Sequence, residues 1–195
     1  MTPSSDLVVL VLAGGGSTRF GSPKQLADID GATLLERVVD SVQVWAPGRV
    51  VVVLGAQSER IRKVIADSVE IVICPEWDSG MSASLAAGVA AIAVDPKVER
   101  CAVVMGDTLG LDPHDAAAVL AASDADPQAV VQATFRRLPA HPTVFPRSWF
   151  ERLVGLTGDR GARDLLRSGY ENVVRVPLTK SELVDVDTPA DLPTH

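Results

Sequence analysis

Cysteine is scarce in this chain: Cys74 and Cys101 are the 2 thiols among 195 residues. Each lies in a short apolar run, and neither has a second cysteine or a histidine at the spacing of metal ligands. The pattern therefore does not indicate a metal site built on cysteine. Two buried free thiols in a reducing compartment are the simplest interpretation, which predicts a cytoplasmic protein.

Long apolar runs and an excess of positive charge are also missing. The run nearest the N-terminus, residues 7–13, is too short to cross a bilayer and follows Asp6 rather than a basic residue, so we expect neither a membrane span nor a signal peptide. The net charge of −7 argues against nucleic acid and anionic membranes as partners, because both require a basic face. A small anionic ligand is still allowed, since a few local cations suffice to bind it.

What the chain does contain is an alternation of two kinds of segment. Short apolar runs rich in β-branched residues predict strands buried on both faces, which are typical of a parallel sheet. These runs lie at residues 7–13, 49–55, 69–75, 101–107 and 129–135. Segments with helical spacing separate them, at residues 32–44, 58–66, 82–93 and 114–122. The alternation predicts βαβ units and hence a three-layer α/β fold with a mostly parallel central sheet.

The alternation ends after residue 135. A stretch with prolines (HPTVFP, residues 141–146), two helical segments (148–156 and 161–168) and a final apolar run (173–178) follow. A sheet that begins parallel and ends mixed is the simplest account. No repeat and no low-complexity linker divides the chain, so we expect one domain over residues 1–195.

The first predicted strand ends in a glycine-rich loop, within LVVLVLAGGGSTRFGSPKQL (residues 7–26). Ligands of open parallel sheets bind beyond the carboxyl ends of the strands, so this loop is placed to contact a phosphate. Neither common phosphate-loop pattern fits. The dinucleotide fingerprint needs glycine where the chain has Arg19, and the Walker pattern needs lysine where it has Ser22.

The loop nevertheless carries the groups that a polyphosphate requires. Its three consecutive glycines, residues 14–16, let backbone N–H groups approach a phosphate closely, while Arg19 and Lys24 supply countercharge. Pro23 resists an immediate helix and is expected to keep the loop extended around its ligand. A tight structural turn with two solvated cations is the alternative.

Three aspartates are candidates for holding a cation. Asp107 follows the fourth predicted strand on the ligand side of the sheet, where it could hold Mg²⁺ against phosphates. Asp185 and Asp187 lie on one face if their segment is extended, and two carboxylates repel unless a cation joins them. Alternatively, Asp107 caps a helix or turn, and the segment Asp187-Thr188-Pro189 caps a final helix.

The segment after the third predicted strand, CPEWDSGMSASLAAGV (residues 74–89), holds further polar candidates. Gly80 permits a tight turn, and Ser82 is a candidate N-cap whose helix N-terminus could face an anion. Ser84 and Leu85 could equally be ordinary helix positions, and for Leu85 we prefer that interpretation.

The region between Arg136 and Arg175 combines a histidine with an excess of positive charge. His141 is held extended by Pro142, and a lone histidine is more often structural than catalytic. Eight basic residues in this region outnumber four acidic ones, which suits an anionic second substrate. Solvated helix faces are the alternative explanation of the charge.

Five segments resemble motifs of the MobA/MocA-like nucleotidyltransferases of molybdenum cofactor synthesis, which have a Rossmann-like, glycosyltransferase-A-like fold. They occur in the family's order between residues 7 and 192, and read LAGGGSTRFGSPK, CPEWDSGMSASLAAGV, GD, AHPTVFPRSWFERLVGLTGDRGARDLL and LVDVDTPADL. There are two departures. Leu109 replaces the proline of the family's G-D-x-P, and Ala140 replaces the glycine before His141.

The resemblance implies a role for each candidate residue. The catalytic residues would be Lys24, Arg19 and Asp107. Asp107 and Asp187 would bind Mg²⁺ with Asp185 in support, and an acceptor would lie near Ser84 and His141. The nucleotide-binding set would be Leu12, Ala13, Gly14, Gly15, Gly16, Ser17, Arg19, Lys24, Gly80 and Ser82.

The resemblance also implies a reaction, the transfer of CMP or GMP from CTP or GTP to molybdopterin or the molybdenum cofactor with release of pyrophosphate. The acceptor phosphate is already an anion and needs no general base, so catalysis would consist of positioning and charge neutralisation. LAGG in the loop favours GTP, whereas GMSASL, HPTVF and GDRGARDLL together favour CTP, which we prefer.

Two alternatives stay open from the sequence. One is a nucleotidyltransferase with a sugar-phosphate or phospholactate acceptor. The other is a non-catalytic nucleotide-binding helper, with a molybdoenzyme or its chaperone as protein partner, which the altered loop at Thr108 and Leu109 favours.

Overall fold

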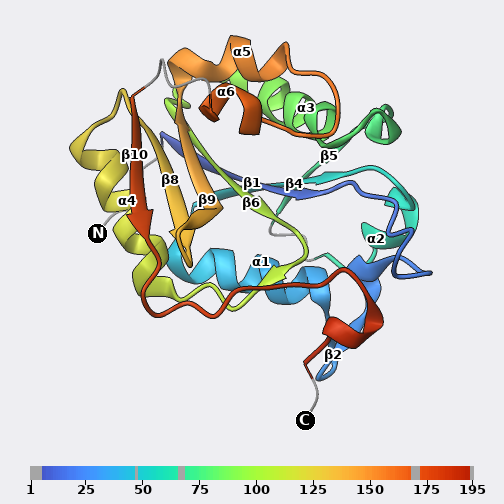
Figure 1. Ribbon diagram of the computed structural model, residues 1–195. Helices are drawn as coiled ribbons and strands as arrows, with labels where there is room; N and C mark the ends of the chain where they lie inside the picture. The colour runs from blue at the N-terminus through green and yellow to red at the C-terminus, as the bar shows by residue number, and fades with distance from the viewer. Residues whose placement is uncertain (1–5, 47, 66–68, 168–171, 194–195) are drawn as a thin grey trace.

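The centre of the protein is a seven-stranded sheet in the order β10-β8-β9-β6-β1-β4-β5 (Figure 1). The computed structural model describes residues 6–46, 48–65, 69–167 and 172–193. The strands of this sheet are β1 (Leu7–Ala13), β4 (Arg49–Leu54), β5 (Glu70–Ile73), β6 (Arg100–Met105), β8 (Val130–Phe135), β9 (Leu138–Pro146) and β10 (Val173–Pro177). Neighbours are parallel except at β9, which runs antiparallel to β6 and β8. The predicted sheet, mostly parallel with a mixed end, is confirmed.

Helices cover both faces of the sheet (Figure 1). One face carries α1 (Leu34–Trp45) and α4 (Pro113–Ala125), and the other carries α3 (Met81–Ala93), α5 (Phe150–Val154) and α6 (Arg163–Arg167). Along β1, Val9 packs into the core under α1, while its neighbours Val8 and Leu10 pack into the core under α3. The three-layer α/β fold is confirmed, because strands that are apolar at every position can bury both faces.

The start of α1 differs from the expectation by two residues. Residues 32–33 form strand β3 (Ala32–Thr33) against β2 (Asp28–Ile29), so the helix begins at Leu34. Thr33 caps it: its Oγ1 accepts a hydrogen bond from Glu36 N–H at 3.3 Å, and the Glu36 carboxylate accepts one from Thr33 N–H at 2.7 Å. This reciprocal capping box stops the helix from extending to residue 32.

Three other predicted helices are shorter than expected. The helix predicted at 148–156 is α5, preceded by the 3-10 helix η3 (Arg147–Trp149). The helix predicted at 58–66 is α2 (Ser58–Ile61), and residue 66 lies outside the described residues. The helix predicted at 161–168 begins at Arg163 as α6, and residue 168 again lies outside them. None of the described helices is long and apolar enough to cross a bilayer.

Both cysteines are buried and unpaired, as the apolar runs around them predict. Burial raises the pKa of the Cys101 thiol to about 12. The thiolate is the nucleophilic form, so this cysteine is unreactive at neutral pH.

A buried carboxylate fastens the segment that leaves β10. Asp115 of α4 is 5% exposed and accepts hydrogen bonds from Thr179 Oγ1 at 3.1 Å, Lys180 N at 2.8 Å, Ser181 N at 2.7 Å and Ser181 Oγ at 2.8 Å. Burial alone would raise the pKa of Asp115, but the hydrogen bonds from Thr179, Ser181 and Lys180 together lower it well below its ordinary value.

Replacing Asp115 by alanine should lower the free energy of unfolding by about 3 kcal/mol at neutral pH, because the donors of Thr179, Lys180 and the buried Ser181 lose a charged acceptor. The folded-state pKa is lowered, so this contribution is present above the unfolded-state pKa of about 4 and is lost as the pH falls through the folded-state value. Urea unfolding should show a difference between wild type and Asp115→Ala that shrinks below about pH 4. The exposed Asp40→Ala is the control, and a difference that does not change with pH would contradict this account.

Candidate active-site cleft

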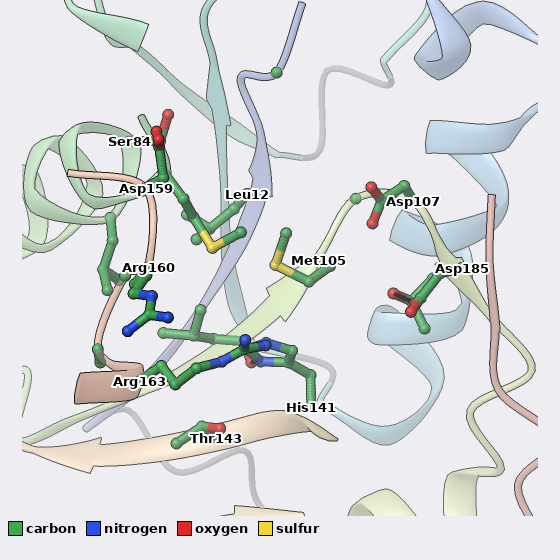
Figure 2. Close-up of a pocket in the computed structure, with 18 of the residues that line it drawn as sticks. Leu12, Ser84, Met105, Asp107, His141, Thr143, Asp159, Arg160, Arg163 and Asp185 are labelled. Carbon is green, nitrogen blue, oxygen red and sulfur yellow. Dashed lines mark hydrogen bonds between the residues drawn. The ribbon is translucent and has the colours of Figure 1, made fainter. Parts of the chain in front are cut away.

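A cleft of about 990 Å³ lies at the carboxyl end of β1 and β6 and extends over the α3 face of the sheet (Figure 2). Nearly all the residues predicted for the site line it: Leu12, Ala13, Gly14, Gly15, Gly16, Ser17, Arg19, Lys24, Gly80, Ser84, Asp107, His141, Asp185 and Asp187. Ser82 does not. Segments from both halves of the chain therefore meet in one cavity, as the order of parallel strands requires.

The glycine-rich loop is held in place by a glutamine that sequence reasoning missed. Gln25 is 3% exposed, and its Nε2 donates to Ala13 O at 2.9 Å and to Gly15 O at 3.1 Å. Ser17 Oγ donates to Gln25 Oε1 at 3.2 Å and accepts from Lys24 N at 3.2 Å. The signal for this role was a polar residue directly after Lys24 and before an apolar position.

The loop is not extended throughout, contrary to the expectation from Pro23. Gly21 N donates to Ser17 O at 3.2 Å, which closes a turn, and Lys24 begins a short 3-10 helix, η1 (Lys24–Leu26), directly after Pro23. The fixed φ of proline, here −59°, suits the residue that precedes a helical turn, so it permits η1 rather than preventing it.

Lys24 joins the two predicted metal ligands. Its Nζ lies 2.6 Å from Asp107 Oδ2, 3.3 Å from Asp187 Oδ1 and 2.9 Å from Val186 O. Arg19 Nη1 contacts the other oxygen of Asp187, Oδ2, at 2.8 Å. Two carboxylates and two cations from three separate segments thus form one charge cluster. Lys24 joins Asp107 to Asp187, whereas the pair expected to share a cation was Asp185 and Asp187, and Asp185 contacts Thr108 instead.

A pair of short strands brings the C-terminal aspartates to Asp107. β7 (Thr108–Leu109) pairs antiparallel with β11 (Val184–Asp185), and Val186 N donates to Asp107 O at 2.9 Å. Val186 is fully buried, while Asp185 and Asp187 on either side of it line the cleft, which matches the predicted alternation. Leu109, which stands where the family motif has proline, lies opposite Val184 in this pairing.

Asp185 and Asp187 differ in their partners. Asp185 Oδ1 accepts a hydrogen bond from Thr108 Oγ1 at 2.6 Å, whereas Asp187 contacts Lys24 and Arg19. The final 3-10 helix, η4 (Pro189–Asp191), is capped by Thr188 and not by Asp187. The segment thus caps the final helix through Thr188, as the alternative expected, while the side chain of Asp187 is left to contact Lys24 and Arg19.

The start of α3 corrects the role expected for Ser82. The N-cap is Gly80, whose φ of 108° is available to glycine, and the helix begins at Met81. Ser82 is therefore inside the first turn, fully buried, with its N–H donating to Gly158 O at 3.1 Å. Its hydroxyl has no hydrogen-bond partner among the described residues and does not face the cleft.

Ser84, one turn further along α3, reaches the cleft as predicted. Its Oγ lies so close to Gly14 that a Cβ added to that glycine would approach it to 2.7 Å. Leu85 also borders the cleft but is 3% exposed and packs in the core, as an ordinary helix position would.

His141 projects from β9 toward the cleft, with Arg163 beside it (Figure 2). Its Nδ1 lies 3.1 Å from Val103 O, and since a carbonyl oxygen only accepts, Nδ1 carries the hydrogen. Burial lowers the pKa of His141. The hydrogen bond to Val103 and the charges of Asp107 and Asp185 raise it, but by less, so the pKa stays below its ordinary value. The ring is therefore neutral at neutral pH, with Nε2 as an acceptor.

The donor set at Lys24 fits a hard divalent cation that a phosphate ligand helps to hold. Within the described ranges, no group of three or more histidine, cysteine, aspartate or glutamate side chains gathers as a complete metal site. Asp107 and Asp187 supply two carboxylates, and magnesium-type ions are typically bound through one or two carboxylates plus substrate phosphates. The residues present therefore suit an ion that arrives with its ligand.

A family model described as a MobA-like NTP transferase domain matches residues 9–174. Among solved structures, Rv0371c from Mycobacterium tuberculosis H37Rv is 27% identical with a TM-score of 0.86, over 98% of this chain and 96% of that one. Its homolog from Mycobacterium sp. strain JC1 is 28% identical with a TM-score of 0.82, over 96% and 93%. A structure of Rv0371c in complex with manganese is 25% identical with a TM-score of 0.79, over 95% of both chains.

More distant similarities agree with the fold. A nucleotidyl transferase from Methanothermobacter superposes with a TM-score of 0.78 at 20% identity, over 95% of this chain and 93% of that one. Among curated proteins, the bifunctional protein GlmU of Streptococcus agalactiae serotype V is 39% identical over 69 residues, or 34% of this chain. That match spans 15% of GlmU, so it compares a part of each protein.

Proposed function

Because this chain belongs to the MobA-like NTP transferase family, we propose that it transfers a nucleoside monophosphate, CMP in preference to GMP, from the triphosphate to molybdopterin or its molybdenum-loaded form. The observation that carries the proposal is the contact of Lys24 Nζ with both Asp107 and Asp187 beside the glycine-rich loop. A polyphosphate that enters this loop meets backbone N–H groups, two cations and two carboxylates.

In the proposed reaction, an oxygen of the acceptor phosphate forms a bond to the α-phosphorus of the triphosphate. The bond between that phosphorus and the bridging oxygen of the β-phosphate breaks, and pyrophosphate leaves with the electron pair. No proton is moved. Lys24 and Arg19 neutralise charge on the triphosphate, and the loop glycines position it. Asp107 and Asp187 would hold Mg²⁺, which when bound supplies further charge neutralisation at the phosphates.

The preference for CTP is based on the longer set of cytidylyl-type motifs, GMSASL, HPTVF and GDRGARDLL. The test is pyrophosphate release by the purified protein with Mg²⁺, molybdopterin and each triphosphate in turn, with glucose 1-phosphate as a second acceptor. We expect release with CTP and molybdopterin. Release with glucose 1-phosphate instead would favour the sugar-phosphate alternative, and tight nucleotide binding without release would favour the non-catalytic helper.

Two adjacent glycines allow a matched test of the loop. A Cβ at Gly15 would meet nothing within 4 Å, whereas a Cβ at Gly14 would lie 2.7 Å from Ser84 Oγ. Gly15→Ala should therefore keep the wild-type melting temperature but bind Mg²⁺–CTP about tenfold more weakly, because its methyl group hinders a phosphate from reaching the backbone. Gly14→Ala should lower the melting temperature. Calorimetric titration and thermal unfolding measure the two effects, and unchanged binding by Gly15→Ala would show that phosphates do not approach there.

A further inference from the structure

The floor of the cleft contains a polar row in an otherwise apolar sheet face. In register across β10, β8 and β9, Arg175 lies beside Gln132, and Gln132 lies beside Thr143. The row two residues earlier on the same face pairs Val173 with Val130, which is fully buried in the α3 core. The face therefore changes from apolar to polar where it borders the cleft.

Gln132 is a buried polar side chain whose carboxamide has no hydrogen-bond partner among the described residues. It is 8% exposed and lines the cleft, and its side chain makes no hydrogen bond within the described parts of the chain. Buried polar groups are almost always hydrogen-bonded, so a carboxamide in this position is suited to a ligand in the cleft.

Three arginines surround this end of the cleft. Arg163 and Arg167 are four residues apart on one face of α6, and Arg175 is on β10. Among the residues that the structure describes, none of the three forms an ion pair with a carboxylate, whereas the neighbouring Arg160 pairs with Asp164 at 3.1 Å. Three cations in a cleft, with no counterion in the described part of the chain, indicate an anionic ligand group.

Arg175 is too far from Lys24 to share one phosphate with it. In the strand order β10-β8-β9-β6, Arg175 is three strands from β6, the strand that leads to Asp107. Neighbouring strands are about 4.8 Å apart, so the lateral distance is about 14 Å. A ligand that reaches both ends therefore needs one anionic group at the charge cluster and another near Arg175.

We propose that the acceptor is a phosphate monoester that carries a second anionic group at its far end. Its reacting phosphate lies near Asp107, and its middle part forms a hydrogen bond with the carboxamide of Gln132. Arg163, Arg167 and Arg175 bind the second anionic group. This inference rests on the proposed nucleotidyl transfer and deepens it, because a monoester with an uncharged body would leave the three arginines without a counterion.

The test is a comparison of two probes, hexane-1,6-diol bisphosphate and hexyl phosphate, titrated calorimetrically into the full chain with Mg²⁺ and α,β-methylene-CTP. The bisphosphate should bind about tenfold more tightly, and this ratio should fall at high salt because exposed charges are screened. Arg175→Gln should bring the ratio close to one. The control is Arg152→Gln, because Arg152 is on α5 and its guanidinium lies 4.3 Å from the centre of the Trp149 ring. This variant should keep the wild-type ratio.

Equal affinities of the two probes for the wild type, or an unchanged ratio in Arg175→Gln, would overturn the second anionic group. If thermal unfolding shows that Arg175→Gln is not folded, Arg167→Gln is used instead, and the ratio of the two probe affinities is measured in that variant. Binding of the CTP analogue is measured separately in the same experiment. If the CTP analogue binds but the two probes bind equally well, only the second anionic group of the acceptor is refuted. If the CTP analogue does not bind, the proposed nucleotidyl transfer is refuted.

Discussion

Asp107→Asn is expected to lower the rate of pyrophosphate release by at least about a hundredfold, because charge stabilisation at a reaction centre is typically worth several kcal/mol. Asparagine keeps the shape of the side chain but removes the negative charge that contacts Lys24 at 2.6 Å. Lys24 keeps its contacts with Asp187 Oδ1 and Val186 O, so its ammonium group is not left without acceptors. The loss should therefore be one of catalysis and metal binding rather than of folding.

The measurement is single-turnover pyrophosphate release at saturating Mg²⁺ and CTP, together with the melting temperature. Asp185→Asn is the comparison, because Asp185 lines the same cleft but its carboxylate is bonded to Thr108 Oγ1 and does not contact Lys24. It should lose much less activity. Equal losses in the two variants would remove the distinction between Asp107 and Asp185 that the geometry makes, and full activity in Asp107→Asn would defeat its proposed role.

Much of the fold could be predicted because the central strands are apolar along most of their length. Residues 7–13 and 49–54 do not alternate between apolar and polar side chains, so neither face of these strands is suited to solvent. This predicted a sheet that is covered on both faces. The end of the pattern after residue 135 likewise indicated β9, which is the antiparallel strand. Boundaries were less predictable: Thr33 and Glu36 form a cap, which fixes the start of α1 by hydrogen bonds rather than by periodicity.

The candidate site was predictable where it depends on strand ends. Asp107 follows a central parallel strand, and Asp187 alternates with a buried Val186, so both positions carry a local signal. Ser82 was misplaced because a serine after glycine resembles an N-cap, and the positive φ of Gly80 that moves the cap is not visible in the sequence.

Residues of the polar floor gave no local signal. Gln132 lies within an apolar run, and its position beside Thr143 and Arg175 depends on the register of three strands that are distant in sequence. Periodicity specifies which residues share a face of one strand, but pairing across strands is decided by packing and turn geometry. The excess of basic residues after Arg136 could be counted from the sequence, whereas its arrangement around Gln132 required the fold.

Lys24→Met is expected to have two effects of opposite sign. Catalytic efficiency with CTP should fall by at least about a hundredfold, because a charge-assisted contact with the triphosphate is lost. Binding of Mn²⁺ to the nucleotide-free protein should become about tenfold tighter, because the carboxylates of Asp107 and Asp187 lose the cation that competes for their oxygens. Electron paramagnetic resonance of free Mn²⁺ measures the second effect without any turnover.

Two other substitutions serve as comparisons for Lys24→Met. Arg19→Gln should have smaller effects, because the Arg19 side chain is 73% exposed and exposed ion pairs contribute little. Lys97→Met, remote from the cleft, controls for loss of a lysine. Unchanged or weaker Mn²⁺ binding in Lys24→Met would mean that Asp107 and Asp187 do not hold the ion together.

The opposite signs make the experiment diagnostic. If Lys24→Met merely disordered the site, the glycine-rich loop and the two aspartates would both be displaced, and nucleotide and metal would bind more weakly together. Weaker binding of the nucleotide together with tighter binding of the free metal ion requires that the two aspartates stay in place. The Lys24 side chain, 13% exposed between two carboxylates, would then keep the free ion from binding until a triphosphate draws the ammonium group away. In the wild type, metal and nucleotide would consequently bind together, and the factor by which CTP tightens the binding of Mn²⁺ to the wild type measures that coupling.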